Sequence, residues 1–262
     1  MTVDLPGVGS NLHDHPLVYM KFRCTEPVSL SRYTRLDRKL AVGAQWLLTK
    51  TGTGASNNVE TCAVLRSDAG VRQPDVEIQY LPVITDHDMG LKAGLHGFTF
   101  CIGPNRVEGT GWVKLRSADP KDPPRILSNF LSTQHDIDLM RRSIVMAREI
   151  ANQPAYARFG TSEAEPGPQV RTSAEIEAYM RQGVSGDFHV SGTCRMGSDR
   201  MAAVDPELRV HGIESLRVVD ASVMPSIVSA NTNATTIMIG EKAADIIRGR
   251  PPLLPANLPL PA

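Results

Sequence analysis

The chain has 262 residues, of which 41% are hydrophobic and 21% are charged. This composition is typical of a soluble globular protein, and the length allows one large domain or two smaller ones. The 28 basic side chains balance 28 acidic ones. A neutral chain lacks the electrostatic footprint of a protein that binds nucleic acid or anionic membrane, so we expect small molecules or proteins as partners.

The sequence carries no obvious targeting signal. No apolar run approaches the ~20 residues that a transmembrane helix needs, and residues 1–7 lack the basic and apolar parts of a secretory signal. We therefore expect a cytoplasmic location, with peripheral attachment to a membrane left open. The four cysteines are widely spaced, which favours reduced thiols that mostly fill the core: Cys24, Cys62, Cys101 and Cys194.

The first predicted elements are a strand and a helix. Residues 17–24 mix β-branched, aromatic and polar positions as a strand does. Apolar residues then recur at helical spacing over 36–48, which predicts an amphipathic helix. Gly52 and Gly54 are expected to terminate it.

Three further strands are predicted in the middle of the chain, at 75–82, 96–103 and 111–116. Loops rather than helices join them. This arrangement favours an antiparallel sheet, because parallel strands need long crossover connections.

Helices dominate the second half of the predicted structure. A helix over 134–151 has an apolar face made of Ile137, Met140, Ile144, Ala147 and Ile150. Thr172 and Glu175 resemble a capping box that starts a short helix ending near Met180. A last helix is predicted over 232–248, and the proline-rich tail from Pro251 is expected to be extended.

A dinucleotide-binding fingerprint is not found. The only candidate is Gly7-Val8-Gly9, which lacks the third glycine, a preceding strand and a following helix. We therefore reject it.

The segment from His189 to Gly197, with the sequence HVSGTCRMG, is the first candidate for chemistry. Imidazole has an ordinary pKa of about 6.5 and can accept a proton at neutral pH. A histidine in such a loop is either a structural residue or a general base. Downstream, Asn231 and Thr232 stand at the start of the last helix, where they serve either as N-caps or as ligands beside free N–H groups.

Between these two segments, residues Leu216–Val219 are predicted to form a buried strand that ends at Asp220, Ala221 and Ser222. Ligands gather at the carboxyl ends of strands in α/β sheets. Asp220 is thus placed to accept hydrogen bonds from a polyol such as a ribityl chain.

Three stretches together resemble the C-terminal half of the glucose-methanol-choline (GMC) oxidoreductases, and are most similar to the choline-oxidising members. They are residues 4–16 (DLPGVGSNLHDHP), the segment 189–197, and residues 216–244, which include VDASVMP and NTNATTIMIGEK. The resemblance covers residues 2–249.

The resemblance implies an FAD-dependent enzyme that moves a hydride from a primary alcohol to the flavin. His189 would be the base and Asn231 its partner, both facing the reactive N5 side of the flavin ring. Asp220 and Ala221 would contact the ribityl or pyrophosphate region, with Asn231 and Thr232 at the helix start. Asn11 would lie near the flavin, where the chain leaves the cofactor domain.

The implied fold is α+β. Residues 17–203 would form a substrate-binding domain, an antiparallel sheet with flanking helices. Residues 1–16 and 204–249 would belong to an FAD-binding α/β domain whose N-terminal part is absent, and 250–262 would be a proline-rich tail.

Substrate recognition is assigned to two residues. Glu60 matches a glutamate that faces the quaternary ammonium in choline-oxidising members, although a surface glutamate at a strand edge is an equal alternative. Gln79 stands where choline oxidases carry a histidine, so the alcohol is left open. No metal site is predicted, because neither the pair His13 and His15 nor residues 86–88 have further ligands at recognisable spacing.

Two hypotheses from different classes remain. The first is half of an FAD-dependent alcohol dehydrogenase that acts on a small-molecule alcohol and is completed by a separately encoded N-terminal FAD-binding half. The second is a catalytically silent remnant, or an interaction module, that binds no flavin. The electron acceptor, whether oxygen, a quinone or a carrier, is left open.

Overall fold

The computed structural model describes residues 3–85, 94–251 and 253. Their contacts divide the chain into two compact units. The first comprises Met1–Asp14, Thr110–Ser128 and His189–Ala262, and the second comprises His15–Gly109 and Asn129–Phe188. Residues 110–128 and 189–203 thus group with the first unit, and not with the middle segment 17–203 in which the sequence analysis placed them.

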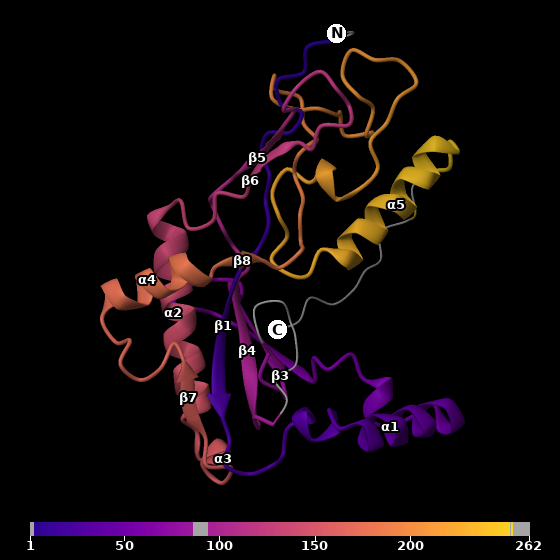
Figure 1. Ribbon diagram of the computed structural model, residues 1–262. Helices are drawn as coiled ribbons and strands as arrows, with labels where there is room; N and C mark the ends of the chain where they lie inside the picture. The colour runs from indigo at the N-terminus through magenta and orange to yellow at the C-terminus, as the bar shows by residue number, and fades with distance from the viewer. Residues whose placement is uncertain (1–2, 86–93, 252, 254–262) are drawn as a thin grey trace. The chain divides into compact units, whose positions relative to one another are not determined.

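An antiparallel sheet forms the centre of the second unit, in the order β2-β3-β4-β1-β7 (Figure 1). Every pair of neighbours in it runs antiparallel, as predicted for strands 17–24, 75–82 and 96–103. The strands are β1 (Pro16–Arg23), β2 (Thr61–Leu65), β3 (Val76–Leu81), β4 (Gly97–Pro104), β7 (Ser162–Glu165) and β8 (Ser185–Gly186), the last of which pairs with the start of β1.

Alternation along the strands separates the two faces of this sheet, since successive side chains point to opposite sides. On β1, Val18, Met20 and Phe22 lie in the main core, whereas Leu17 and Tyr19 belong to a separate small cluster on the other face. The main core face is covered by a helix. The opposite face carries polar residues, among them Glu77 and Gln79 of β3.

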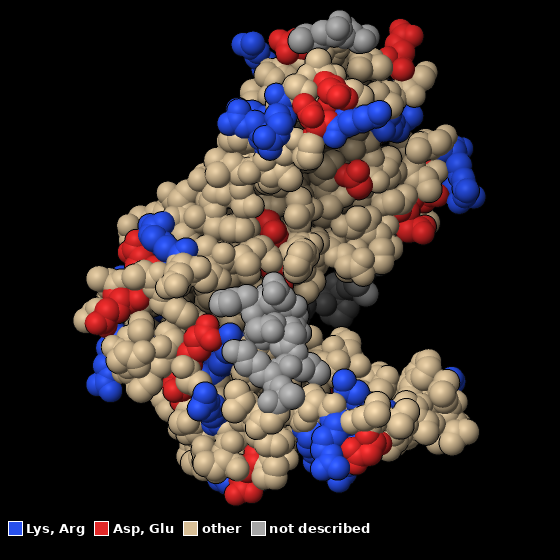
Figure 2. All heavy atoms as spheres, viewed as in Figure 1, with Lys and Arg blue, Asp and Glu red and all other residues tan. Residues whose placement is uncertain are grey.

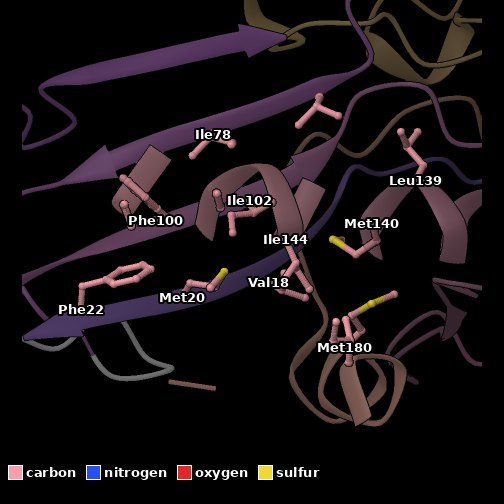
Figure 3. Packing of buried hydrophobic residues seen from close by; sticks show 14 of the residues in the cluster. Val18, Met20, Phe22, Ile78, Phe100, Ile102, Leu139, Met140, Ile144 and Met180 are labelled. Carbon is pink, nitrogen blue, oxygen red and sulfur yellow. The ribbon is translucent and has the colours of Figure 1, made fainter. Parts of the chain in front are cut away.

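The covering helix is α2 (Gln134–Ala151), which begins at the predicted residue because the Thr133 side chain accepts a hydrogen bond from the Asp136 amide at 3.1 Å. Its apolar face packs on the sheet, and Figure 3 shows Met140 and Ile144 close to the β1 residues of the core. Full burial of one such side chain stabilises a fold by roughly 1.5–3 kcal/mol. This layer therefore fixes the shape of the sheet.

The predicted capping box is present at the start of α4 (Ser173–Gly183). The Glu175 amide donates to the Thr172 hydroxyl, and the Glu175 carboxylate accepts from the Thr172 amide at 2.9 Å. These bonds hold the pKa of Glu175 below its usual value. Ile176 and Met180 of α4 are buried in the same core as α2, and the short helix α3 (Pro154–Ala157) follows α2.

Helix α1 (Leu36–Thr49) forms as predicted but buries no residue. Within the described residues, its main contacts with other elements are with the short helices η1 (Leu30–Tyr33) and η2 (Thr53–Ala55) that flank it. The helix ends before the predicted glycines, because Lys50 adopts the left-handed conformation with φ 57° and donates its amide to the Trp46 carbonyl.

The first unit contains little regular structure. Strand β5 (Trp112–Lys114) pairs with β6 (Arg125–Leu127), so the predicted strand 111–116 is not part of the large sheet. The other elements are η3 (Ala221–Val223) and α5 (Asn233–Ile247). A small core joins them, made of Val204, Leu208, Val223, Met224, Ile239 and Ala243.

The predicted buried strand over Leu216–Val219 is wrong. Leu216 and Val219 are 47% and 36% exposed, and the segment makes one isolated bridge, between Arg217 and Arg209. A strand of this kind is buried only when neighbours cover both of its faces. Among the described residues no such neighbouring strands form, and the run is exposed.

The surface shows no single-sign region in the view of Figure 2, where acidic and basic side chains alternate. No helix within the described ranges combines the length and the hydropathy needed to cross a bilayer. All four cysteines are free; Cys101 is buried, whereas Cys62 is exposed and does not fill the core as predicted.

Candidate active site

Phe188, which directly precedes His189, has an unusual backbone conformation. Phe188 has φ 59°, in the left-handed region, and its side chain is 90% exposed. The His189 amide then donates to Oδ1 of Asp14 at 2.8 Å. A carboxylate from the N-terminal segment thereby anchors the histidine. The sequence analysis assigned no role to Asp14, although it lies in the quoted stretch 4–16.

The residues after His189 are held on both sides by backbone hydrogen bonds. On one side, His13 and Ser191 exchange amide-to-carbonyl bonds of 3.0 and 2.9 Å. On the other, the amides of Cys194 and Met196 donate to the carbonyls of Ser222 and Val223, each at 2.8 Å. The histidine segment is therefore the middle of three aligned segments.

Asn11 ties these segments together with its side chain. Its Nδ2 donates to the carbonyls of Gly192 and Pro225, both at 3.2 Å, and its Oδ1 lies 3.2 Å from Nε2 of His13. Its φ of 60° is one that asparagine tolerates better than most residues. In this structure Asn11 positions protein segments, a role that the sequence analysis did not assign to it.

The glycines at 7 and 9 are explained by close backbone contacts. A Cβ at Gly7 would overlap the Met201 carbonyl oxygen, and one at Gly9 would overlap that of Val113. The Gly9 amide also donates to Thr193 at 2.8 Å. These glycines allow close packing inside the first unit.

The structure brings His189 and Asn231 together across 42 residues, with Nε2 of the imidazole 3.3 Å from Nδ2 of the amide. An amide nitrogen only donates, so the facing imidazole nitrogen is the acceptor. An imidazole nitrogen that accepts a hydrogen bond carries no hydrogen and can take up a proton. His189 is half-buried and Asn231 is exposed, so both are within reach of a ligand.

The start of α5 departs from an ordinary N-cap. Thr232 is buried, has helical backbone angles and makes no side-chain capping bond. Without that bond, the first amides of the helix are a ready site for anionic or electron-rich groups. Asp220 is exposed, and its Oδ1 caps η3 by accepting from the Ser222 amide at 2.8 Å.

The two predicted substrate residues lie in the second unit, on one face of its sheet. Gln79 is paired with Cys62 on β2 and Cys101 on β4. The Glu60 amide donates to Tyr80, which continues the register and sets Glu60 opposite Leu81, on the same face as Gln79. Glu60 is exposed and accepts a hydrogen bond from Ser56 at 2.7 Å.

The structure supports no metal site in the described part of the chain, where no three potential ligands come together. His13 and His15 fall in different units. Residues 86–88 lie outside the described ranges.

A sequence model of the GMC oxidoreductase family matches residues 108–240, which include His189 and Asn231. The chain belongs to this family. It is 44% identical over 259 residues to an oxygen-dependent choline dehydrogenase of Brucella ovis, covering 98% of this chain and 47% of the relative. The mitochondrial choline dehydrogenase of Homo sapiens is 45% identical, over 98% and 43% of the two chains.

Solved structures agree with this membership. The chain resembles Aspergillus oryzae formate oxidase, in a structure concerned with FAD modification, with a TM-score of 0.86 and 25% identity over 94% of this chain and 48% of the other. Pyridoxine 4-oxidase of Mesorbium loti gives a TM-score of 0.78 and 26% identity, over 95% and 45%. This GMC oxidoreductase chain thus spans slightly less than half the length of the relatives it matches.

Gly192 offers a test of how the histidine segment is held. Its φ is 87°, and an added Cβ would overlap the Asn11 carbonyl oxygen and lie 2.9 Å from Nδ2 of Asn11. We expect Gly192→Ala to lower the free energy of unfolding by about 1–3 kcal/mol, measured by urea denaturation with circular dichroism.

The matched control is Gly240→Ala in α5, where an added Cβ meets nothing within 4 Å. A mid-helix alanine is expected to stabilise by roughly 0.5–1 kcal/mol. Equal effects of the two substitutions would contradict the close approach at Gly192.

Proposed function

We propose that this chain is the C-terminal part of an FAD-dependent enzyme that oxidises a primary alcohol, with a cationic, choline-like alcohol as substrate. The observation that carries the proposal is the 3.3 Å separation between Nε2 of His189 and Nδ2 of Asn231. Family membership supports it, and so do the names of the relatives, two of which are choline dehydrogenases.

Three features of the first unit fit FAD. The start of α5 lacks a side-chain cap, Asp220 presents an exposed carboxylate, and Ile237 and Met238 of α5 are 58% and 55% exposed. Amides at a helix start suit an electron-rich ring edge, and a carboxylate suits ribityl hydroxyls. We assign Asn11, Asp220, Ala221, Asn231 and Thr232 to the cofactor side of the site. FAD, when bound, supplies the acceptor for the hydride.

His189 would act as the general base. The backbone of His189 is held by the bond from its amide to Asp14 and by the aligned segments on either side, and its Nε2 faces Asn231. From this position it would take the hydroxyl proton of the alcohol, which raises the electron density at the carbon that loses hydride. A positioned base typically contributes roughly 10²–10⁴-fold in rate.

Asn231 would hold the substrate oxygen. In the structure its Nδ2–H faces Nε2 of His189 at 3.3 Å, so a substrate hydroxyl that replaced this bond would accept from the amide while it gives its proton to His189. A donor aimed at a developing alkoxide stabilises the transition state more than the ground state. The pair therefore divides the work: the imidazole removes the proton and the amide holds the charge.

We assign recognition of the substrate's cationic group to the second unit. Glu60 is exposed on the sheet face that also carries Gln79, and a carboxylate is suited to a permanent cation. We therefore interpret the second unit as the substrate domain and the first as part of the FAD domain. We assign the rest of the flavin site to the part of the relatives' length that this chain does not match.

Replacement of the base tests the mechanism. We expect His189→Ala to slow flavin reduction by the alcohol by roughly 10²–10⁴-fold, while FAD stays bound, measured by stopped-flow absorbance of the flavin. His135→Ala, at an exposed histidine of α2, is the control and should leave the rate unchanged. An unchanged rate in His189→Ala would refute the assigned role.

Replacement of the anionic residue tests the substrate class. We expect Glu60→Gln to raise the apparent Kd of choline about tenfold, a loss of about 1.4 kcal/mol. The neutral isostere, in which carbon replaces the nitrogen, should lose far less because it carries no charge for Glu60 to attract. Both constants are read from the concentration dependence of flavin reduction.

The control for this substitution is Glu26→Gln, which removes an exposed carboxylate from the same unit. It should change neither constant. If Glu60→Gln weakens choline and its neutral isostere equally, Glu60 is a surface residue and not the cation's partner.

A further inference from the structure

The face of the sheet that carries Gln79 also contains a buried carboxylate. Glu77 on β3 is only 8% exposed. Its Oε1 accepts from Nε2 of Gln79 at 3.0 Å, and its Oε2 accepts from Nδ2 of Asn105 at 3.1 Å. Both donors are neutral, and Glu77 forms no ion pair with any residue of the described ranges.

This carboxylate determines which way the Gln79 amide points. An ionised carboxylate only accepts hydrogen bonds, so the NH₂ group of Gln79 must face it. The Gln79 carbonyl oxygen is then directed elsewhere. Within the described residues the Gln79 side chain makes no other hydrogen bond, and it is partly exposed. Gln79 therefore presents its carbonyl oxygen as an acceptor in a fixed direction.

The neighbours of Gln79 in its row are two thiols. Burial and the Asp187 carboxylate raise the pKa of the Cys101 thiol to about 12, and partial loss of hydration at the sulfur with the Glu77 and Asp187 carboxylates raises that of Cys62 to about 12. Both thiols are therefore neutral at physiological pH. Glu60, on the same face, is a second acceptor. The sheet face that carries Glu60 and Gln79 therefore presents hydrogen-bond acceptors to a ligand.

We propose that Glu77 is a positioning residue that makes Gln79 a hydrogen-bond acceptor in the substrate site, and that the substrate is an amino alcohol whose ammonium keeps an N–H group. This inference rests on the proposed function. A quaternary ammonium has no N–H for the Gln79 oxygen, whereas a protonated tertiary amine has one. A hydrogen bond from a charged donor is stronger than one between two neutral groups.

The experiment compares choline with dimethylaminoethanol, which lacks one N-methyl group, in the FAD-loaded enzyme. We expect kcat/KM to favour dimethylaminoethanol by about tenfold or more, mainly through KM. Glu77→Leu should bring the ratio close to one, because it frees the Gln79 amide to turn over. Glu77→Gln should keep most of the ratio, since its carbonyl can still accept from Gln79.

A control and a second measurement separate positioning from a general loss of structure. Glu177→Gln removes a partly exposed carboxylate from α4 and should leave the ratio unchanged. In the ¹⁵N-labelled chain, the side-chain NH₂ of Gln79 should exchange slowly with solvent in the wild type and in Glu77→Gln, and rapidly in Glu77→Leu. This second measurement needs neither flavin nor turnover.

The outcomes distinguish this inference from the proposed function. An active enzyme that prefers choline, or a ratio that survives Glu77→Leu, overturns the inference alone. Rapid exchange of the Gln79 NH₂ in the wild type overturns the positioning role. An FAD-loaded enzyme inactive on every alcohol contradicts the proposed function, and the substrate inference fails with it.

Discussion

The side-chain amide of Asn11 is the contact on which the candidate active site depends. It joins Gly192 and Pro225, which lie 181 and 214 residues away in the sequence, to its own segment, where it also contacts His13. Removal of any one of these bonds would leave a polar group of the first unit without its partner, at a cost of about 1–3 kcal/mol where it is buried. The backbone position of His189 follows from this arrangement and from the Asp14 carboxylate.

In the second unit, the alternation of side chains along each strand links the two faces of the sheet. One face of the sheet is apolar and covered by α2, so the antiparallel register is fixed by burial. The same register determines which residues are neighbours on the other face, including the row Cys62, Gln79 and Cys101. Within the row, Glu77 decides the direction of one amide. Packing on one face therefore sets the hydrogen-bonding character of the other.

Local patterns predicted much of this structure. The bounds of α2 follow from its apolar repeat and its Thr133 cap, and α4 from its capping box. The predictions that failed concern segments whose structure depends on partners far away in the sequence. The run over 216–219 has the residues of a buried strand, yet burial needs neighbours that no local pattern supplies. The same is true of β5, whose strand pattern was visible but whose partner β6 was not.

The residues of the candidate site also fall into those that the sequence predicted and those that it did not. His189 and Asn231 were predicted from a family resemblance, and the structure brings their side chains together. Asp14 and Glu77 were missed as functional residues, because nothing near them in sequence shows which group a carboxylate will meet. Asn11 was predicted beside the cofactor, and its contacts with Gly192 and Pro225 show a structural role that the sequence did not reveal.

The central claim is that the imidazole and the amide act together on one substrate oxygen. A double-mutant cycle of His189→Ala and Asn231→Ala, read as the rate of flavin reduction by the alcohol, tests it most directly. Groups that share one oxygen should lose much less together than the sum of their separate losses, with a coupling of about 1–3 kcal/mol. Losses that simply add would contradict the account.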